Sequence, residues 1–106
     1  MYRIAEVHDY GFVLEKYSQD VMNDIIWYNI KYNVITSGYD PVHIKVNGIV
    51  TNTVIDIVSS GCMSIVYTKE KLPCNINKNF KVSFEEFAIT MSSLIVDTGF
   101  YIILEE

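Results

Sequence analysis

The fold of this chain is decided by the stretch Lys45-Val46-Asn47-Gly48-Ile49-Val50. Asn-Gly between two runs rich in β-branched residues is a strong β-hairpin signature, because a type I′ turn needs positive φ at both central residues. The two strands of this hairpin are predicted over residues 42–46 and 49–58. After Ser59-Ser60-Gly61, residues 62–68 form a third predicted strand, so the sequence indicates an antiparallel meander.

A second pattern predicts a helix over residues 84–97. Ser83 and Glu86 have the spacing of a capping box, in which each side chain satisfies the other residue's free backbone N–H. Apolar side chains that would share one face of this helix are Phe84, Phe87, Ala88, Met91, Leu94 and Ile95. Gly99 stands where a left-handed helix C-cap belongs, and the apolar run 100–104 then favours an interior strand.

The segment 15–33 carries two competing patterns. Apolar residues at spacings of three and four form a helical stripe, consisting of Leu14, Tyr17, Val21, Ile25, Tyr28 and Tyr32. Without a turn residue between Gly11 and Ser37, a helix is favoured. From residue 28 onward apolar and polar residues also alternate as in a strand, so residues 28–35 stay open between helix and strand.

Two further segments complete the predicted order of elements. Residues 3–7 indicate a weak first strand, and the polar segment 69–79, which contains Pro73, is typical of a loop. The order is then strand, helix, meander, helix, strand. This order predicts one α+β domain over residues 1–106, with a mainly antiparallel sheet and two helices in a single layer on one face.

Composition and charge narrow the classes of protein. The 106 residues are 50% hydrophobic and carry a net charge of −5, with Arg3 as the only arginine. This argues against nucleic-acid binding, which needs clustered cations. The longest run without a charge, 57–68, is too short for a membrane-spanning helix, and the first nine residues lack the pattern of a secretion signal. Cys62 and Cys74 are too few for a disulfide scaffold, so we expect a cytoplasmic protein with free thiols.

The tripeptide Asp97-Thr98-Gly99 resembles the active-site triplet of aspartic proteases. In that family the triplet lies on a loop early in each lobe and is followed by strands, whereas here seven residues follow Gly99. The resemblance is therefore rejected in favour of a helix end.

Other candidate chemistry also has a simpler explanation. Cys62 with His8 or His43 could form a nucleophile and base, but a cysteine in a strand is more often a small buried hydrophobe. The two cysteines and two histidines lack the close pairs of a zinc site. Carboxylates at Glu85-Glu86 suit a first helical turn. We therefore predict no enzyme activity, no cofactor and no metal site.

Charge and apolar surplus together indicate a binding protein. Residues 1–40 and 81–106 carry net charges of −3 and −4, whereas residues 41–80 carry +2. If the stripe of the first helix faces the core, then Ile26, Trp27 and Ile30 either contact a second layer or form a surface patch. Tyr and Trp are enriched at the energetic centres of interfaces, and an acidic field attracts a basic partner.

The sequence thus predicts a non-enzymatic protein that occludes a basic protein partner. In general character it resembles the immunity proteins that neutralise bacterial nuclease toxins, and also phage-encoded inhibitors of host defence enzymes. The expected partner-binding residues are Asp20, Asp24, Trp27, Tyr28, Glu86 and Asp97. We expect a monomer or a weak homodimer, and the competing hypothesis is a self-associating module that pairs through a sheet edge or through Ile26, Trp27 and Ile30.

Overall fold

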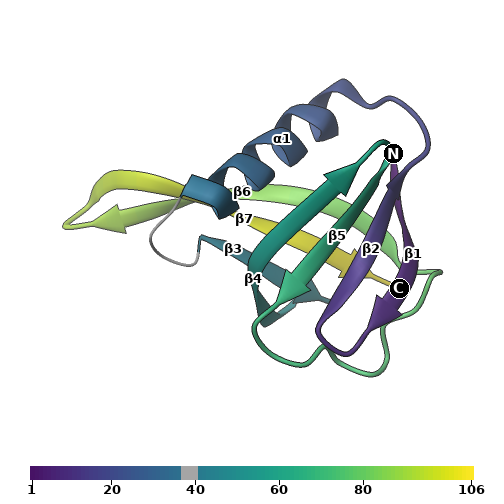
Figure 1. Cartoon of the computed structure of the whole chain (residues 1–106). Helices are drawn as coiled ribbons and strands as arrows, with labels where there is room; N and C mark the ends of the chain where they lie inside the picture. The colour runs from purple at the N-terminus through teal and green to yellow at the C-terminus, as the bar shows by residue number, and fades with distance from the viewer. Residues whose placement is uncertain (37–40) are drawn as a thin grey trace.

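The computed structural model describes residues 1–36 and 41–106, and within them it has seven strands and one helix. Figure 1 shows the helix lying across one end of a strongly curved sheet. None of the described residues belongs to a helix long and apolar enough to cross a membrane. The elements are β1 (Tyr2–His8), β2 (Gly11–Lys16), α1 (Val21–Thr36), β3 (Val42–Val46), β4 (Ile49–Ser60), β5 (Met63–Thr68), β6 (Lys81–Met91) and β7 (Leu94–Glu105).

The seven strands form a closed barrel in the order β1-β2-β5-β4-β3-β7-β6. Neighbouring strands are antiparallel except β3 and β7, which run parallel from Val42 opposite Phe100 to Val46 opposite Leu104. The barrel closes between β1 and β6, where one pair of residues, Arg3 and Lys81, is in register. This closing junction is the shortest contact between neighbouring strands of the barrel.

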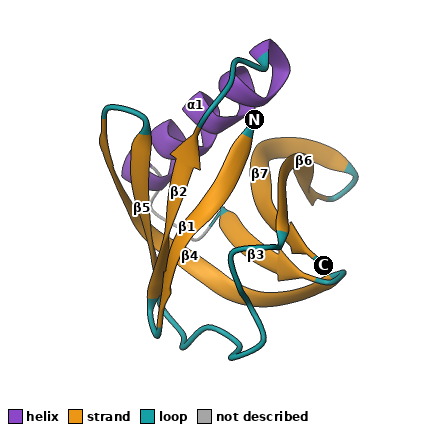
Figure 2. Cartoon of the chain, turned by 90° about the vertical axis from the view of Figure 1, so that its right-hand side faces the viewer, coloured by secondary structure: helices purple, strands orange, loops and turns teal. Residues whose placement is uncertain are grey.

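One apolar cluster, with side chains from every strand, fills the barrel, and both ends are covered. At one end α1 inserts Trp27 and Ile30. At the other end lies the segment between β5 and β6 (Figure 2). It contributes three buried side chains, Leu72, Ile76 and Phe80. A helix and a loop therefore complete a core that the short strands alone would leave open.

The predicted hairpin and meander are confirmed. Asn47 and Gly48 join β3 to β4 with positive φ values of 47° and 83°, as a type I′ turn requires. β3, β4 and β5 are antiparallel neighbours. The strands predicted over 3–7 and 100–104 lie within β1 and β7, and the predicted loop lies between β5 and β6.

The predicted helix over residues 84–97 is wrong, because this segment is the hairpin of β6 and β7. Ser83, the proposed capping residue, pairs with Ile103 across the two strands. Ser92 and Ser93 form the turn with positive φ values of 52° and 66°. Neither residue is the Asn, Asp or Gly that usually marks such a turn. The helical spacing of the apolar residues was therefore the only clear local pattern in this segment.

Gly99, expected to cap that helix, instead lies inside β7. The ring of Phe87 covers Gly99 and stacks on Tyr101 at 4.5 Å between ring centroids. A Cβ at residue 99 would clash with the Phe87 ring. The glycine is thus explained by the close approach of an aromatic side chain across the hairpin.

The predicted α+β architecture with two helices on one face of an open sheet is also wrong. The sheet is closed, and α1 is the single helix of the described residues. The helix expected within 15–33 is displaced, because Glu15 and Lys16 belong to β2 and α1 begins at Val21. Residues 28–35 are helical, so the strand alternative for them is wrong.

Replacing Ser92 by Asn and Ser93 by Gly should stabilise the protein, because both new residue types suit a turn with positive φ. We expect the free energy of unfolding to rise by about 1 kcal/mol and the melting temperature by about 4–8 °C, measured by circular dichroism. The matched control, Ser18→Gly, changes an exposed serine whose φ is not positive and should bring no gain. A loss of about 1 kcal/mol, as for glycine inside a helix, would contradict the hairpin.

Candidate functional site

The helix presents to solvent the apolar face that was expected to lie inside. Trp27 and Ile30 are 5% and 0% exposed, and Ile26 packs partly buried against the core. Of the two alternatives for these three residues, the surface patch is therefore wrong. The large apolar side chains of α1 that are exposed are Val21, Met22, Ile25, Tyr28, Tyr32 and Ile35.

Three rings, which we call the aromatic clamp, determine which face of α1 lies inward: Tyr2, Trp27 and Phe84. Trp27 stacks on Phe84 at 5.2 Å between centroids, and Tyr2 meets Phe84 edge-on at 5.1 Å. Tyr2 lies on β1 and Phe84 on β6, the two strands of the closing junction. Burying the Trp27 indole on the inner face removes about 150–250 Å² of its surface from water. With this face inward, the hydroxyl groups of Tyr28 and Tyr32 on the outer face stay in contact with water.

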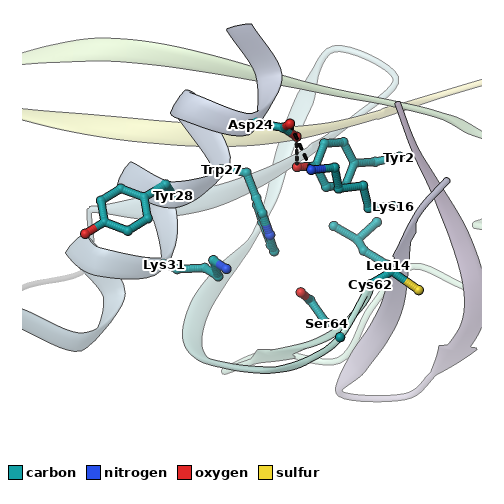
Figure 3. Close-up of a pocket in the computed structure, with 10 residues that line it drawn as sticks. Tyr2, Leu14, Lys16, Asp24, Trp27, Tyr28, Lys31, Cys62 and Ser64 are labelled. Carbon is teal, nitrogen blue, oxygen red and sulfur yellow. Dashed lines mark hydrogen bonds and ion pairs between the residues drawn. The ribbon is translucent and has the colours of Figure 1, made fainter. Parts of the chain in front are cut away.

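Asp24 ties the start of α1 to the barrel. Its Oδ2 accepts a hydrogen bond from Lys16 Nζ at 2.8 Å, and its Oδ1 accepts one from the Tyr2 hydroxyl at 2.7 Å (Figure 3). The hydrogen bonds from Lys16 and then Tyr2 hold the pKa of the Asp24 carboxyl below its usual 3.8. Burial, together with the bond to Asp24, raises the pKa of Tyr2 above its usual value. Asp24 is thus engaged within the fold.

A cavity of about 250 Å³ lies beside this network, between α1 and the β4–β5 turn (Figure 3). Tyr28 and Lys31 line it from the helix, and Cys62 and Ser64 line it from the turn and β5. The Ser64 hydroxyl is bonded to that of Ser59 at 2.8 Å. Tyr2, Lys16 and Asp24 also line the cavity, so the bonded network forms part of its wall.

The structure does not bring a histidine to Cys62. This residue is exposed, in the turn before β5 instead of in the predicted strand. Its carbonyl accepts a bond from the N–H of Lys16, at one end of the β1–β2 hairpin, whereas His8 lies at the other end beside Gly11. His43 is opposite Thr53 on β4, about 20 Å along the strand from the β4–β5 turn.

The outer part of the β6–β7 hairpin, residues 87–98, is an element that we call the β6–β7 arm; Asp97 lies in it, and Glu85 and Glu86 come directly before it. β7 pairs with β3 from Phe100 onward, so within the arm the strand pairing that the described residues show is that of β6 with β7, and Figure 1 shows the arm projecting beyond the barrel. From residue 82 to 106 the sequence has no Lys, Arg or His. The large apolar side chains near the arm's tip, each 56–70% exposed, are Met91, Leu94, Ile95 and Val96.

The residues predicted to bind a partner are divided between two places. Asp20 and Tyr28 are exposed at the start and on the outer face of α1, where Asp20 accepts hydrogen bonds from Asn23. Glu86 is exposed at the base of the arm, and Asp97 is half-buried within it. Trp27, buried in the clamp, is not available at the surface.

Neither the exposed tip of the arm nor the exposure of the outer face of α1 was predicted from the sequence. The tip could not be found once residues 84–97 were read as a helix. The outer face could have been found, because its residues were recognised as a stripe and assigned to the wrong side. Among the described residues, no group of three or more His, Cys, Asp or Glu side chains could hold a metal ion.

Comparison of the chain with protein-family models, curated proteins and solved structures finds no match. The function is therefore inferred from the outer face of α1, the tip of the β6–β7 arm and the charges beside them.

Replacing Trp27 by Ala should destabilise the protein by about 3–5 kcal/mol, because it leaves a cavity beneath α1 and removes the clamp's stacking. The matched change Tyr28→Ala, on the outer face, should cost about 0.5 kcal/mol or less. Urea denaturation followed by circular dichroism measures both. Equal losses for the two variants would contradict the orientation of α1.

Asp24→Asn should make stability less sensitive to acid. The pKa of Asp24 is lower in the folded protein than its usual 3.8, so its stabilisation is complete above that value and is lost as pH falls through the folded pKa. The difference in unfolding free energy between wild type and Asp24→Asn should therefore shrink from about pH 5 to about pH 2. Lys16→Met should weaken the same dependence, and a difference that stays constant with pH would contradict this role.

Proposed function

We propose that this protein is a non-enzymatic binding protein that occludes a basic protein partner, with the β6–β7 arm as its main contact. The single observation that carries the proposal is the arm itself, an apolar tip on a hairpin that has no Lys, Arg or His from residue 82 onward. Contiguous exposed apolar side chains on a soluble protein are typical of an interaction site. The arm's shape suits insertion into a cleft of the partner.

The charge of the arm indicates what kind of cleft it fits. Glu85 and Glu86 are exposed at its base, and Asp97 lies along it. Lysines and arginines around the mouth of a cleft would meet the exposed carboxylates of Glu85 and Glu86 while the cleft's interior takes up Leu94 and Ile95. Such complementarity raises association rates by ~10- to 10³-fold and disfavours acidic proteins as partners. A nuclease, whose active site is basic because it binds phosphate, has this chemistry.

The proposal refines the residue set predicted from sequence. Glu86 and Asp97 stay in it and are joined by Leu94 and Ile95, while the buried Trp27 leaves it. Asp24 is also removed from the set, because its carboxylate is bonded to Lys16. The role of an immunity-type inhibitor agrees with the net charge of −5. The two free cysteines suit a reducing compartment such as the cytoplasm.

The test is photo-crosslinking from position 95, with a photoreactive amino acid in place of Ile95, in cells that produce the protein. We expect one basic protein to be crosslinked, and none from the same replacement at Ile49, which is exposed on the β3–β4 hairpin. The purified partner is then titrated with wild type and variants. An acidic crosslinked partner, or equal crosslinking from both positions, would contradict the proposal.

In that titration, Leu94→Ser with Ile95→Ser should weaken binding at least ~30-fold, as expected for central interface residues. The control, Ile49→Ser with Val50→Ser, removes a similar apolar area from the other hairpin and should leave binding unchanged. Glu86→Lys should slow association about 10-fold at low salt, whereas Glu6→Lys on β1 should not. Binding that is insensitive to the tip variants would show that the partner docks elsewhere.

A further inference from the structure

The cavity between α1 and the β4–β5 turn has three hydrogen-bond donors in its wall. They are the indole N–H of Trp27 and the ammonium of Lys31, both on α1, and the hydroxyl of Ser64 on β5. Trp27 and Lys31 are four residues apart, so they are neighbours along one side of the helix. Figure 3 shows the indole nitrogen, the lysine nitrogen and the serine oxygen directed towards the same space. We call these three groups the donor triad.

The indole N–H is an unpartnered donor on a buried side chain. Trp27 is 5% exposed, and no acceptor among the described residues receives a hydrogen bond from its nitrogen. The N–H of a buried tryptophan usually has a hydrogen-bond partner. The nitrogen of Trp27 therefore points to an acceptor supplied from within the cavity.

Ser64 is a polar residue at an inward position of the barrel. It is buried, lies opposite Leu14 of β2, and is followed at the next inward position by the buried Val66. Its hydroxyl is bonded to that of Ser59. Because a hydroxyl both donates and accepts, the Ser64 proton is left for a third group when Ser59 is the donor. The side chain can therefore bond to a ligand without losing its partner in the protein.

The charges of the cavity wall favour a ligand with one negative charge. Lys16 and Asp24 form an ion pair at 2.8 Å, whereas Lys31 takes part in no ion pair with the residues that the structure describes. With two lysines and one aspartate the wall carries a net charge of +1, in a chain whose net charge is −5. A monoanion neutralises this charge, whereas a dianion leaves a surplus negative charge beside Asp24.

The size of the cavity and its other side chains favour a compact, partly apolar molecule. Leu14 and Tyr28 line the cavity together with the ring of Trp27. Its volume of about 250 Å³ is below the ~300–1,000 Å³ of pockets that enclose drug-sized ligands. A nucleotide is therefore too large, and a molecule of a single ring or a short branched chain fits.

We propose that this cavity binds a small monocarboxylate, a compact apolar molecule with a single carboxylate group. The two oxygens of a carboxylate provide about four acceptor positions, enough for all three members of the donor triad. The carboxylate lies against Lys31, and the apolar part lies against Leu14 and the ring of Trp27. The site is separate from the β6–β7 arm, so its tests and those of the arm can fail independently.

The test uses Trp27 as its reporter, because the chain has one tryptophan and hence one indole N–H signal in a proton–nitrogen NMR spectrum. The probes are benzoate and isovalerate at neutral pH, each compared with its uncharged counterpart, benzyl alcohol or isoamyl alcohol. We expect at least one acid to shift the indole signal saturably, with a dissociation constant of about 0.1–10 mM. Its alcohol should bind at least ~10-fold more weakly. No saturable shift with either acid, or equal binding of acid and alcohol, would overturn the proposal.

Inorganic phosphate tests the preference for one negative charge. Above pH 8, where phosphate is doubly charged, it should bind more weakly than the better of the two acids. Tighter binding of phosphate would overturn the assignment to a carboxylate.

Lys31→Met tests the charge of the donor triad. It keeps an unbranched side chain at a half-buried position and should weaken binding of the acid at least ~10-fold. The matched control, Lys78→Met, makes the same replacement at an exposed position between β5 and β6, changes the net charge equally, and should leave binding unchanged. Unchanged binding in Lys31→Met, or equal weakening in both variants, would overturn the proposal.

Ser64→Ala tests the hydroxyl of the triad. Loss of one hydrogen bond should weaken binding about 3- to 10-fold, whereas Ser60→Ala, at an exposed position of β4, should have no effect. Melting temperatures of the variants, measured in parallel, show that each is folded, and Lys31→Met tests the site even where Ser64→Ala is unstable. Unchanged binding in a folded Ser64→Ala would overturn the role of the triad.

Discussion

The closure of the barrel depends on a junction that has almost no strand pairing of its own. β1 and β6 share one registered pair, Arg3 with Lys81, yet the rings of Tyr2 and Phe84 meet there at 5.1 Å. Trp27 of α1 packs against both rings. Aromatic packing between β1, β6 and α1 thus stabilises a junction that has little strand pairing. Because Trp27 of α1 takes part in this packing, closure of the barrel and docking of the helix depend on each other. The orientation of α1, and with it the face left to solvent, follows from this contact.

Local chemistry made part of the fold predictable. Asn47-Gly48 has few conformational alternatives, so the β3–β4 hairpin could be placed from two residues. Ser92 and Ser93 also have positive φ, but serine is not a residue type that predicts such a turn. The strands on either side of them have apolar residues at helical spacing. What decides in favour of strands is the pairing of β6 with β7 over their whole length, with β7 in turn held by β3, a segment far away in the sequence, from Phe100 onward. No local pattern contains that information.

The candidate surfaces were predictable to a similar degree. An apolar surplus and the net charge of −4 over residues 81–106 were evident from the sequence, and both remain central to the proposed function. Which stripe of α1 is exposed was not evident, because both stripes are apolar and the choice depends on the fit of Trp27 against Phe84. The arm and the outer face of α1 are two different exposed surfaces of the molecule.

The position of β6 in the chain has a consequence for synthesis on the ribosome. Elongation at ~5–20 residues per second separates the appearance of Arg3 from that of Lys81 by roughly 4–16 s. During this interval the nascent chain has β1 with one open edge and a helix whose indole lacks its stacking partner. Unpaired strand edges and bare aromatic surface are substrates for aggregation. Until β6 emerges, a nascent chain of this topology is therefore the species most in need of a chaperone.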